Sequence, residues 1–344
     1  MSTVRLGIIG PGLIWRRRHE PALAPLGDAF KISAFCASSE RSRAEIAQRY
    51  PGAPFVTDYR AFVGRDDVDA VVVLTPIHLN APVALAGLKA GKDVLLEKPM
   101  ARTPEEAQTL MQAADRTGRR LGVLEQYGYD ARWRILRDLI HSGEIGEVVL
   151  YDLMMHLPFD AGDNDTGEYA RTSWRQTPDF PLGTLFDGGH HQIAMLSILF
   201  GAPKWVYASG TSLRRDYGEF DHVLMQFGYE GRLRGMFSHS GYLSASGNYF
   251  NIRGTEGLVA VDRVGATVEH KNGSKRVVPL TTVGLSGRGL MSERSHEMMW
   301  RALARAYAEG REPDYTPADA YRELSILFAI AHSARQGERA MIGG

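Results

Sequence analysis

A lysine follows a short apolar run in the first third of the chain. Residues 93–96 read Asp-Val-Leu-Leu, and Glu97-Lys98-Pro99 come directly after them. Ligands of open α/β sheets bind outside the carboxyl ends of the strands. A lysine there can donate to a reacting oxygen and stabilise an alkoxide as it forms, although most lysines after strands are simply solvated. The position predicts a group that handles developing negative charge.

An acid and a histidine share a spacing typical of one helix face in the second half of the chain. Asp187 precedes His191 by four positions, which brings two side chains together on an α-helix. A histidine oriented by a carboxylate is a good general base near neutral pH. Such a base suits removal of a proton from a hydroxyl group. The alternatives are a helix-face ion pair, or a capping Asp187 with core histidines.

A metal site is a second interpretation of the same region. Imidazole and carboxylate groups are good zinc ligands, and His156, Asp187, His190 and His191 are available. No second cluster in the sequence supports this set, and hydride chemistry with a lysine does not need a metal. We therefore expect no metal.

A glycine-rich turn near the N-terminus predicts a dinucleotide site. Residues 4–9 are expected to form a buried strand, and Gly10 and Gly12 separate it from a helix. In that context the backbone can approach a pyrophosphate at the helix N-terminus. The third small position of the pattern falls at Trp15, whose bulk should prevent the closest helix–sheet packing, so the loop is expected to be shifted or one residue longer. Expected contacts are Gly10, Gly12, Leu13 and Ile14.

The end of the second predicted strand distinguishes NAD from NADP. An acid there normally accepts from the ribose 2′-OH of NAD, but Ala37 occupies this place. Ser38, Ser39 and Arg43 follow and suit a 2′-phosphate, so we predict NADP in preference to NAD. In the alternative interpretation Ser39 only caps the next helix, the arginines are solvated, and Glu40 serves NAD.

The elements that position these residues change character near residue 125. Up to that point strands alternate with helices, which predicts a parallel sheet with crossover connections. Further on, a long loop over 157–182 and a helix over 185–200 precede successive strands between 204 and 270. We expect an α/β protein with a doubly wound Rossmann domain over 1–125. A C-terminal α+β domain with an open, mostly antiparallel sheet should follow over 126–344.

Composition and charge argue against several classes of protein. Lys+Arg and Asp+Glu both number 40 in 344 residues, so the basic excess typical of nucleic-acid or anionic-membrane binding is missing. The lone Cys36 permits no intrachain disulfide, which suits a reducing compartment. The sequence starts without a secretory signal and has no apolar run near the ~20 residues that span a bilayer. We expect a cytoplasmic protein with no nucleic-acid or membrane partner.

Several stretches, taken together, resemble the glucose-fructose oxidoreductase/inositol dehydrogenase (Gfo/Idh/MocA) family. The resemblance runs almost end to end. It is carried by residues 75–82, 90–99, 142–146, 174–175, 183–191 and 333–337. It implies a hydride transfer between NAD(P) and a CH–OH or C=O carbon of a sugar, anhydrosugar or cyclitol. It also implies an open sheet used in oligomer contacts, and hence a homodimer or homotetramer.

The resemblance also assigns roles to residues. Lys98, Asp187 and His191 would form the catalytic set and would converge around one nicotinamide ring. The residues that would line the cofactor are Thr75, Pro76, His78, Asn80, Glu97, Lys98, Gln126, Trp174 and Arg175. The candidates for substrate binding are Lys98, Tyr127, His156, Asp187 and His191, together with Tyr129, Asp160 and the loop 157–182.

The chain departs from the family pattern at three positions. These are Trp15 in the glycine loop, Gly128 where many members carry an arginine, and Ala194 where many carry an acid. The last two bear on substrate identity more than on chemistry. The rival functions are a cofactor-binding regulatory or sensor protein of the same fold and a reductase of a non-sugar carbonyl or an imine.

Overall fold

The computed structural model describes residues 3–159, 165–214, 218–262, 265–280 and 294–343. The chain forms two compact units, Met1–Tyr129 with Arg294–Tyr321 and Asp130–Glu293 with Arg322–Gly344. The sequence interpretation divides the chain once, after residue 125. The structure adds a late segment to the first unit because the buried Trp300 packs edge-on against Phe30, with ring centroids 5.5 Å apart.

The first unit contains a six-stranded parallel sheet in the order β3-β2-β1-β4-β5-β6. Its strands are β1 (Val4–Ile9), β2 (Phe30–Cys36), β3 (Phe55–Val56), β4 (Ala70–Val73), β5 (Asp93–Glu97) and β6 (Leu121–Leu124). All four residues of β4 are buried, as expected for a central strand covered by helices on both faces. The doubly wound Rossmann arrangement predicted from the sequence is confirmed.

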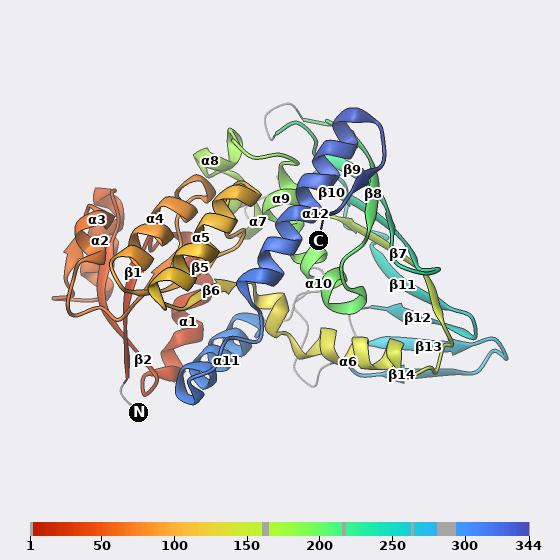
Figure 1. The fold of residues 1–344 in the computed structure, drawn as a ribbon, viewed down its shortest axis with the longest axis horizontal. Coiled ribbons are helices and arrows are strands. Elements are labelled where there is room, and N and C mark those ends of the chain that lie inside the picture. The colour runs from red at the N-terminus through yellow and green to blue at the C-terminus, as the bar shows by residue number, and fades with distance from the viewer. Residues whose placement is uncertain (1–2, 160–164, 215–217, 263–264, 281–293, 344) are drawn as a thin grey trace. The chain divides into compact units, whose positions relative to one another are not determined.

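The helical elements of the first unit connect these strands. They are η1 (Trp15–His19), α1 (Glu20–Leu23), η2 (Ala24–Leu26), α2 (Glu40–Arg49), α3 (Tyr59–Val63), α4 (Ile77–Lys89), α5 (Pro104–Thr117), η3 (Gln126–Tyr129) and α11 (Ser295–Glu309). Figure 1 shows α4 beside α5, and α11 beside α1. Thr103 caps α5 by accepting a hydrogen bond from the backbone N–H of Glu106 at 3.2 Å, a role typical of threonine at a helix start.

The helix after the glycine loop accommodates Trp15 in an unexpected way. Its first turn, η1, is a π-helix in which the N–H of Glu20 donates to the carbonyl of Trp15. The indole is fully buried and lies edge-on to Phe35 of β2, with centroids 6.1 Å apart. A π turn is wider than an α turn and is common at functional sites. The side chain of Trp15 is thus packed in the core. The sequence instead predicted that its bulk would keep the helix away from the sheet.

The second unit contains a nine-stranded sheet in the order β14-β13-β12-β11-β7-β10-β9-β8-β15. Its strands are β7 (Val148–His156), β8 (Trp205–Thr211), β9 (His222–Gly228), β10 (Arg234–Ser240), β11 (Tyr249–Gly254), β12 (Gly257–Val261), β13 (Ala266–His270), β14 (Lys275–Val278) and β15 (Ala340–Met341). The sheet is antiparallel except where β7 pairs with β10. That exception arises because β7 inserts between β11 and β10.

Helices cover one face of this sheet. The helices of the second unit are α6 (Ala131–His141), α7 (Asp165–Ala170), α8 (Ser173–Gln176), α9 (Thr184–Asp187), α10 (His190–Phe200) and the later part of α12 (Pro317–Gln336). Figure 1 shows α10 and α6 on this side, and Phe200 at the end of α10 stacks on Tyr151 of β7 at 4.6 Å. The predicted long loop 157–182 contains two short helices, α7 and α8. In the described parts of the chain, no helix is both long enough and apolar enough to cross a membrane.

Candidate functional site

The glycine turn after β1 has room for a ligand. Gly10 has φ +78°, and a Cβ there would lie 2.8 Å from the carbonyl oxygen of Leu74, so only glycine fits. A Cβ on Gly12 would meet only the carbonyl of Gly10, at 3.8 Å. Since internal packing does not require glycine at position 12, the space beside it suits the approach of a pyrophosphate. Leu13 and Ile14 follow directly and are half-buried.

Polar side chains after β2 make contacts of their own. Ser39 caps α2 by accepting from the N–H of Ser42 at 3.1 Å, and Ser38 is exposed. Arg43 is exposed and lies 3.9 Å from Glu40. The capping role from the alternative interpretation is therefore present, and it leaves Ser38 and Arg43 accessible for a 2′-phosphate.

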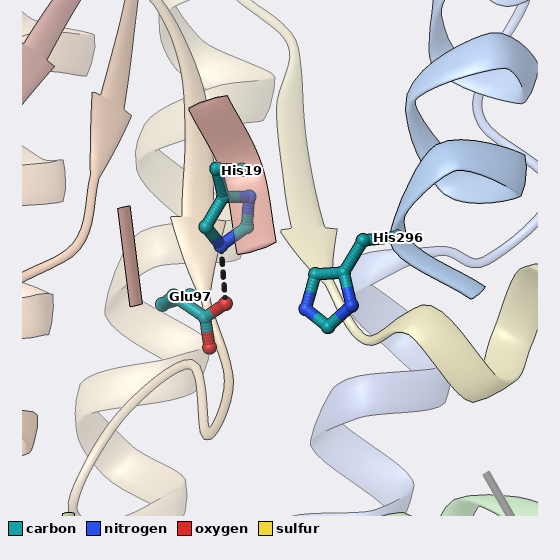
Figure 2. Close-up of side chains that lie close together, drawn as sticks. All are labelled: His19, Glu97 and His296. Carbon is teal, nitrogen blue, oxygen red and sulfur yellow. Dashed lines mark hydrogen bonds and ion pairs between the residues drawn. The ribbon is translucent and has the colours of Figure 1, made fainter. Parts of the chain in front are cut away.

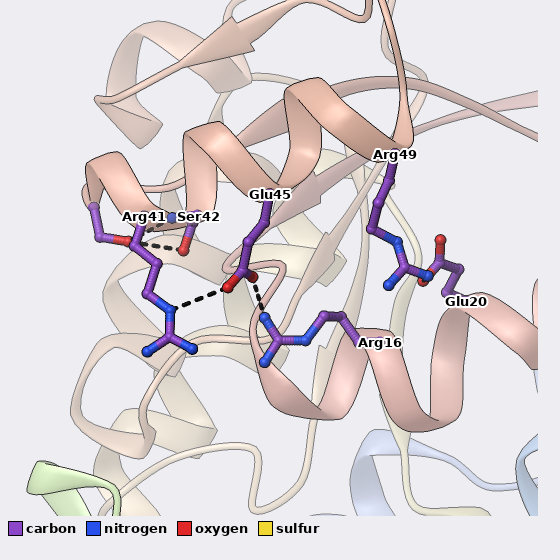
Figure 3. Close-up of polar contacts among 7 residues, drawn as sticks. Arg16, Glu20, Arg41, Ser42, Glu45 and Arg49 are labelled. Carbon is purple, nitrogen blue, oxygen red and sulfur yellow. Dashed lines mark hydrogen bonds and ion pairs between the residues drawn. The ribbon is translucent and has the colours of Figure 1, made fainter.

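Two more arginines meet at one acid beside this strand end. Figure 3 shows Arg16 of η1 and Arg41 of α2 both directed at Glu45. The Arg41 Nε donates to Glu45 Oε1 at 3.0 Å. Sequence reasoning did not single out Arg16, because only the fold brings the first helix against α2.

The carboxyl end of β5 is held by a buried asparagine. The side-chain amide of Asn80 donates to the carbonyl of Glu97 at 3.2 Å and to that of Pro99 at 2.9 Å. Its oxygen accepts from the Thr75 hydroxyl at 2.9 Å. Asn80, predicted to line the cofactor, fixes the backbone on both sides of Lys98. The first unit therefore brings Thr75, Asn80, Glu97 and Lys98 together at one sheet edge.

The side chain of Glu97 points at a histidine that sequence reasoning missed. Figure 2 shows His19 directed at the carboxylate, with Nε2 and Oε1 2.9 Å apart, and His296 close by. Both Glu97 and His19 are buried. A histidine four residues after Trp15, on the inner face of the first helix, was the available signal. Its partner could not be inferred, because Glu97 lies 78 positions away.

The other predicted groups of the first unit differ in exposure. Lys98, Pro76 and His78 are half-buried, whereas Gln126 and Tyr127 in η3 are buried.

A departure from the family pattern has a local explanation in η3. A Cβ on Gly128 would lie 2.5 Å from the ring of the buried Tyr315. Tyr129, a candidate for substrate contact, is also buried, and its ring centroid lies 6.5 Å from that of Tyr315. Tyr315 thus fills the space that an arginine at position 128 would need.

In the second unit, Asp187 is held by an arginine. The Arg175 Nε donates to Asp187 Oδ2 at 2.5 Å, and the guanidinium lies 4.0 Å from the Trp174 ring centroid. Both partners are largely buried. A charge-assisted pair of this kind holds the carboxylate in a fixed direction. The predicted site members Trp174, Arg175 and Asp187 therefore lie together, although Arg175 was expected on the cofactor.

The helix that was expected to carry both Asp187 and His191 is interrupted. Asp187 ends α9, and His191 lies in the first turn of α10 after Gly188 and Gly189. His191 is half-buried. The preceding His190 is buried, 3.2 Å from Glu323 of α12, and so belongs to the interior. The third departure, Ala194, is fully buried in α10.

His156 lies on the other face of the second sheet. Its Nε2 is 2.9 Å from the Ser238 hydroxyl of β10. The next residue of β10, His239, points the opposite way and contacts Thr184 of α9 at 3.2 Å. The structure therefore does not bring His156 together with Asp187. Burial lowers the pKa of His156, and nearby His222 adds to this. The candidate Asp160 lies outside the described residues.

The fold and these two sets of residues define a class of protein, the dinucleotide-binding oxidoreductases. Residues 4–125 match a family described as an oxidoreductase family with an NAD-binding Rossmann fold, and residues 133–260 match the GFO/IDH/MocA C-terminal domain. The chain belongs to the Gfo/Idh/MocA family and is an NAD(P)-dependent oxidoreductase.

Named relatives cover most of the chain. A scyllo-inositol 2-dehydrogenase (NADP(+)) of Bacillus subtilis is 29% identical over 256 residues, which are 74% of this chain and 68% of that protein. A 1,5-anhydro-D-fructose reductase of Ensifer adhaerens is 26% identical over 98% of each chain. A levoglucosan dehydrogenase solved with NADH and levoglucosan has the same fold, with a TM-score of 0.85, 22% identity and 100% of both chains covered.

Proposed function

We propose that this enzyme moves a hydride between NAD(P) and a CH–OH or C=O carbon of a sugar, anhydrosugar or cyclitol. The observation that carries the proposal is the held lysine. Asn80 ties down the backbone on both sides of Lys98 at the carboxyl end of β5, where α/β sheets bind ligands. The inositol, anhydrofructose and levoglucosan enzymes among its relatives support the substrate class.

The chemistry follows from three side chains in the oxidative direction. When bound, the nicotinamide supplies the hydride acceptor. His191 accepts the proton of the substrate hydroxyl on an imidazole nitrogen, and Lys98 donates to the oxygen as negative charge develops. The C–O bond becomes C=O as the hydride leaves the carbon. Asp187, with its direction set by Arg175, favours the protonated imidazole.

Residues of both units are proposed for the remaining contacts. The backbone around Gly10 and Gly12 with Leu13 and Ile14 would hold the pyrophosphate. Thr75, Pro76, His78, Asn80, Glu97, Gln126, Trp174 and Arg175 would line the rest of the dinucleotide. We also propose Tyr127 and His156 for the substrate. His156 has the weakest support, because it projects from the sheet face opposite to His239 and Thr184.

NADP is the proposed preferred cofactor. Ser38 and Arg43 are exposed after β2, and Ala37 stands where NAD-binding sites normally have an acid. The NADP-linked inositol dehydrogenase among its relatives supports this choice. The NADH complexes of its structural neighbours make NAD the alternative.

The open face of the second sheet is the proposed contact between copies of this chain. Tyr207, Leu224 and Met236 lie on the adjacent strands β8, β9 and β10, and Tyr249 lies on β11 beyond β7; all four are on one face and are 40% to 51% exposed. An apolar sheet face of this kind is typical of an interaction surface. We expect a homodimer or homotetramer by light scattering, and a smaller species after Leu224→Arg. A monomeric wild-type protein would contradict the assignment.

We also propose that the enzyme works in the cytoplasm. Its lone cysteine, Cys36, is buried, and burial raises the pKa of its thiol to about 12. Such a thiol neither forms a disulfide nor reacts readily. Fractionation of the source cells would test this placement.

A panel of sugars, anhydrosugars and cyclitols tests the proposed reaction. Each compound is incubated with NADP and with NAD, and the absorbance of the reduced nicotinamide is followed. We expect turnover on at least one polyol, with a lower KM for NADP than for NAD. Binding of the cofactor without turnover on any compound would favour a regulatory protein. Turnover confined to imines or non-sugar carbonyls would shift the substrate class.

A further inference from the structure

A buried polar cluster adjoins the end of β5 in the first unit. It contains His19 from η1, Glu97 from β5 and His296 from α11, and their ligand-type atoms lie within 4.8 Å of one another (Figure 2). His19 is fully buried, and the other two are each 7% exposed. Buried polar groups are expensive unless they are bonded to one another, so the arrangement of protons decides what the cluster does.

Trp300 fixes the tautomer of His19. The indole Nε1 donates to His19 Nδ1 at 3.1 Å, and an indole N–H can only donate. His19 Nδ1 must therefore carry its lone pair, which leaves the ring proton of the neutral imidazole on Nε2. From there it is donated to Glu97 Oε1 at 2.9 Å. The chain of donors runs from Trp300 through His19 to the carboxylate.

The same arrangement disfavours a metal ion. A cation on His19 Nε2 would need the lone pair of that atom and would move the ring proton to Nδ1. That proton would then face the indole N–H of Trp300, two donors with no acceptor. Histidines that bind metals normally donate their other N–H to a carboxylate or carbonyl, and Trp300 offers neither. The cluster is therefore built to hold a carboxylate.

The held carboxylate precedes the proposed catalytic lysine by one residue. Asn80 fixes the backbone at Glu97 and Pro99, while His19 fixes the Glu97 side chain. An ionised carboxylate has about four acceptor sites, and the bond from His19 directs those that remain. The side chain of Glu97 is 10% exposed, so part of it is accessible from outside.

We propose that His19 is a positioning residue of the cofactor site. With its tautomer set by Trp300, it holds the Glu97 carboxylate so that Glu97 accepts a hydroxyl or amide N–H of the nicotinamide dinucleotide. The proposal rests on the proposed function. It also gives the late segment a role, because Trp300 bonds to a residue 281 positions earlier. Residues 294–321 then belong to the first unit by function as well as by packing.

The experiment measures the Kd of NADPH and of NADH by the fluorescence of the reduced nicotinamide. His19→Leu removes the donor to Glu97 and should raise the Kd about 10-fold or more, as for a lost hydrogen bond to a charged group. His19→Gln restores an N–H donor of similar reach and should return the Kd to within about threefold of wild type. Trp300→Phe keeps the packing, removes the indole N–H and should give an intermediate value.

Matched controls separate positioning from general damage. His296→Leu removes a neighbour that lies edge-on to His19, with ring centroids 5.3 Å apart, and should leave the Kd within about threefold of wild type. Thermal unfolding reports whether each variant is folded. If His19→Leu does not fold, the comparison of Trp300→Phe with wild type decides, and equal Kd values overturn the proposal.

Three results distinguish failure of the proposed function from failure of the role proposed for His19. Wild-type protein that binds neither dinucleotide contradicts the proposed function itself. Wild-type binding together with an unchanged Kd in folded His19→Leu overturns only the role of His19. A stoichiometric metal in the wild-type protein that is lost in both His19→Leu and His296→Leu overturns the tautomer argument and makes the cluster a metal site.

Discussion

The carboxyl end of β5 and the junction between α9 and α10 hold their candidate catalytic groups in different ways. Around Lys98 the backbone is clamped by Asn80, a residue of the adjoining βα unit, 17 and 19 positions from the two carbonyls it bonds. Asp187 is held by a side-chain ion pair with Arg175. At the start of the same helix, α9, Thr184 contacts His239 of β10. One side chain holds each group, but Asn80 bonds to the backbone carbonyls on both sides of Lys98, whereas Arg175 bonds directly to the carboxylate of Asp187.

The largest expected effect is at the lysine. Lys98→Ala should lower kcat by about 100-fold or more, because a preorganised donor to the developing oxyanion is lost. Steady-state kinetics on a compound found in the panel measures this. Lys92→Ala is the matched control, because Lys92 lies just before β5 and donates to the carbonyls of Arg65 and Val68. A normal kcat in Lys98→Ala would remove it from the mechanism.

The ion pair at Asp187 should cost stability when it is broken. Arg175→Met leaves a buried carboxylate without its cation, and we expect a loss of about 2–3 kcal/mol in the free energy of unfolding. Urea denaturation measures this loss. The double variant Arg175→Met with Asp187→Asn should recover most of it, since no charge is left unpaired. If the single variant is as stable as wild type, the pair does not hold Asp187.

Much of the first unit could be predicted from local sequence, and much of the second could not. Strand periodicity and the glycine turn give β1 and the loop at Gly10, and Thr103 gives the start of α5. The effect of Trp15 on the first helix was predicted wrongly. Sequence patterns assume α-helical packing, whereas η1 is a π-helix with Trp15 buried. The pairs of His19 with Trp300 and of Arg175 with Asp187 follow from tertiary packing, which no local pattern specifies.

The choice of cofactor gives a smaller effect. Arg43→Ala should raise the KM for NADP about tenfold and leave that for NAD nearly unchanged, because an arginine pairs with a phosphate but not with a ribose hydroxyl. Arg49→Ala is the control, because Arg49 lies at the other end of α2 and pairs with Glu20 of α1 (Figure 3). Equal rises with both cofactors would mean that Arg43 does not read the 2′-phosphate.

The smallest effect at neutral pH is on the free energy of unfolding and comes from His239, which contacts Thr184 of α9. Burial lowers the pKa of His239 to about 3 from an ordinary value of 6.5. The unfolded chain therefore binds a proton between these pH values that the folded protein does not bind, and stability falls as pH falls below 6.5. The slope from this group is at most about 1.4 kcal/mol per pH unit. Urea titrations should show a shallower pH dependence in His239→Gln, and parallel curves would contradict the assignment.

Direct hydride transfer from the substrate carbon to the nicotinamide is tested most directly by following a labelled hydrogen. A panel compound that turns over is prepared with deuterium on the carbon that bears the reacting hydroxyl, and the reduced cofactor is then examined by mass spectrometry and NMR. Direct hydride transfer places one deuterium at C4 of the nicotinamide for each turnover. Release of the label to water, with unlabelled reduced cofactor, would contradict direct hydride transfer.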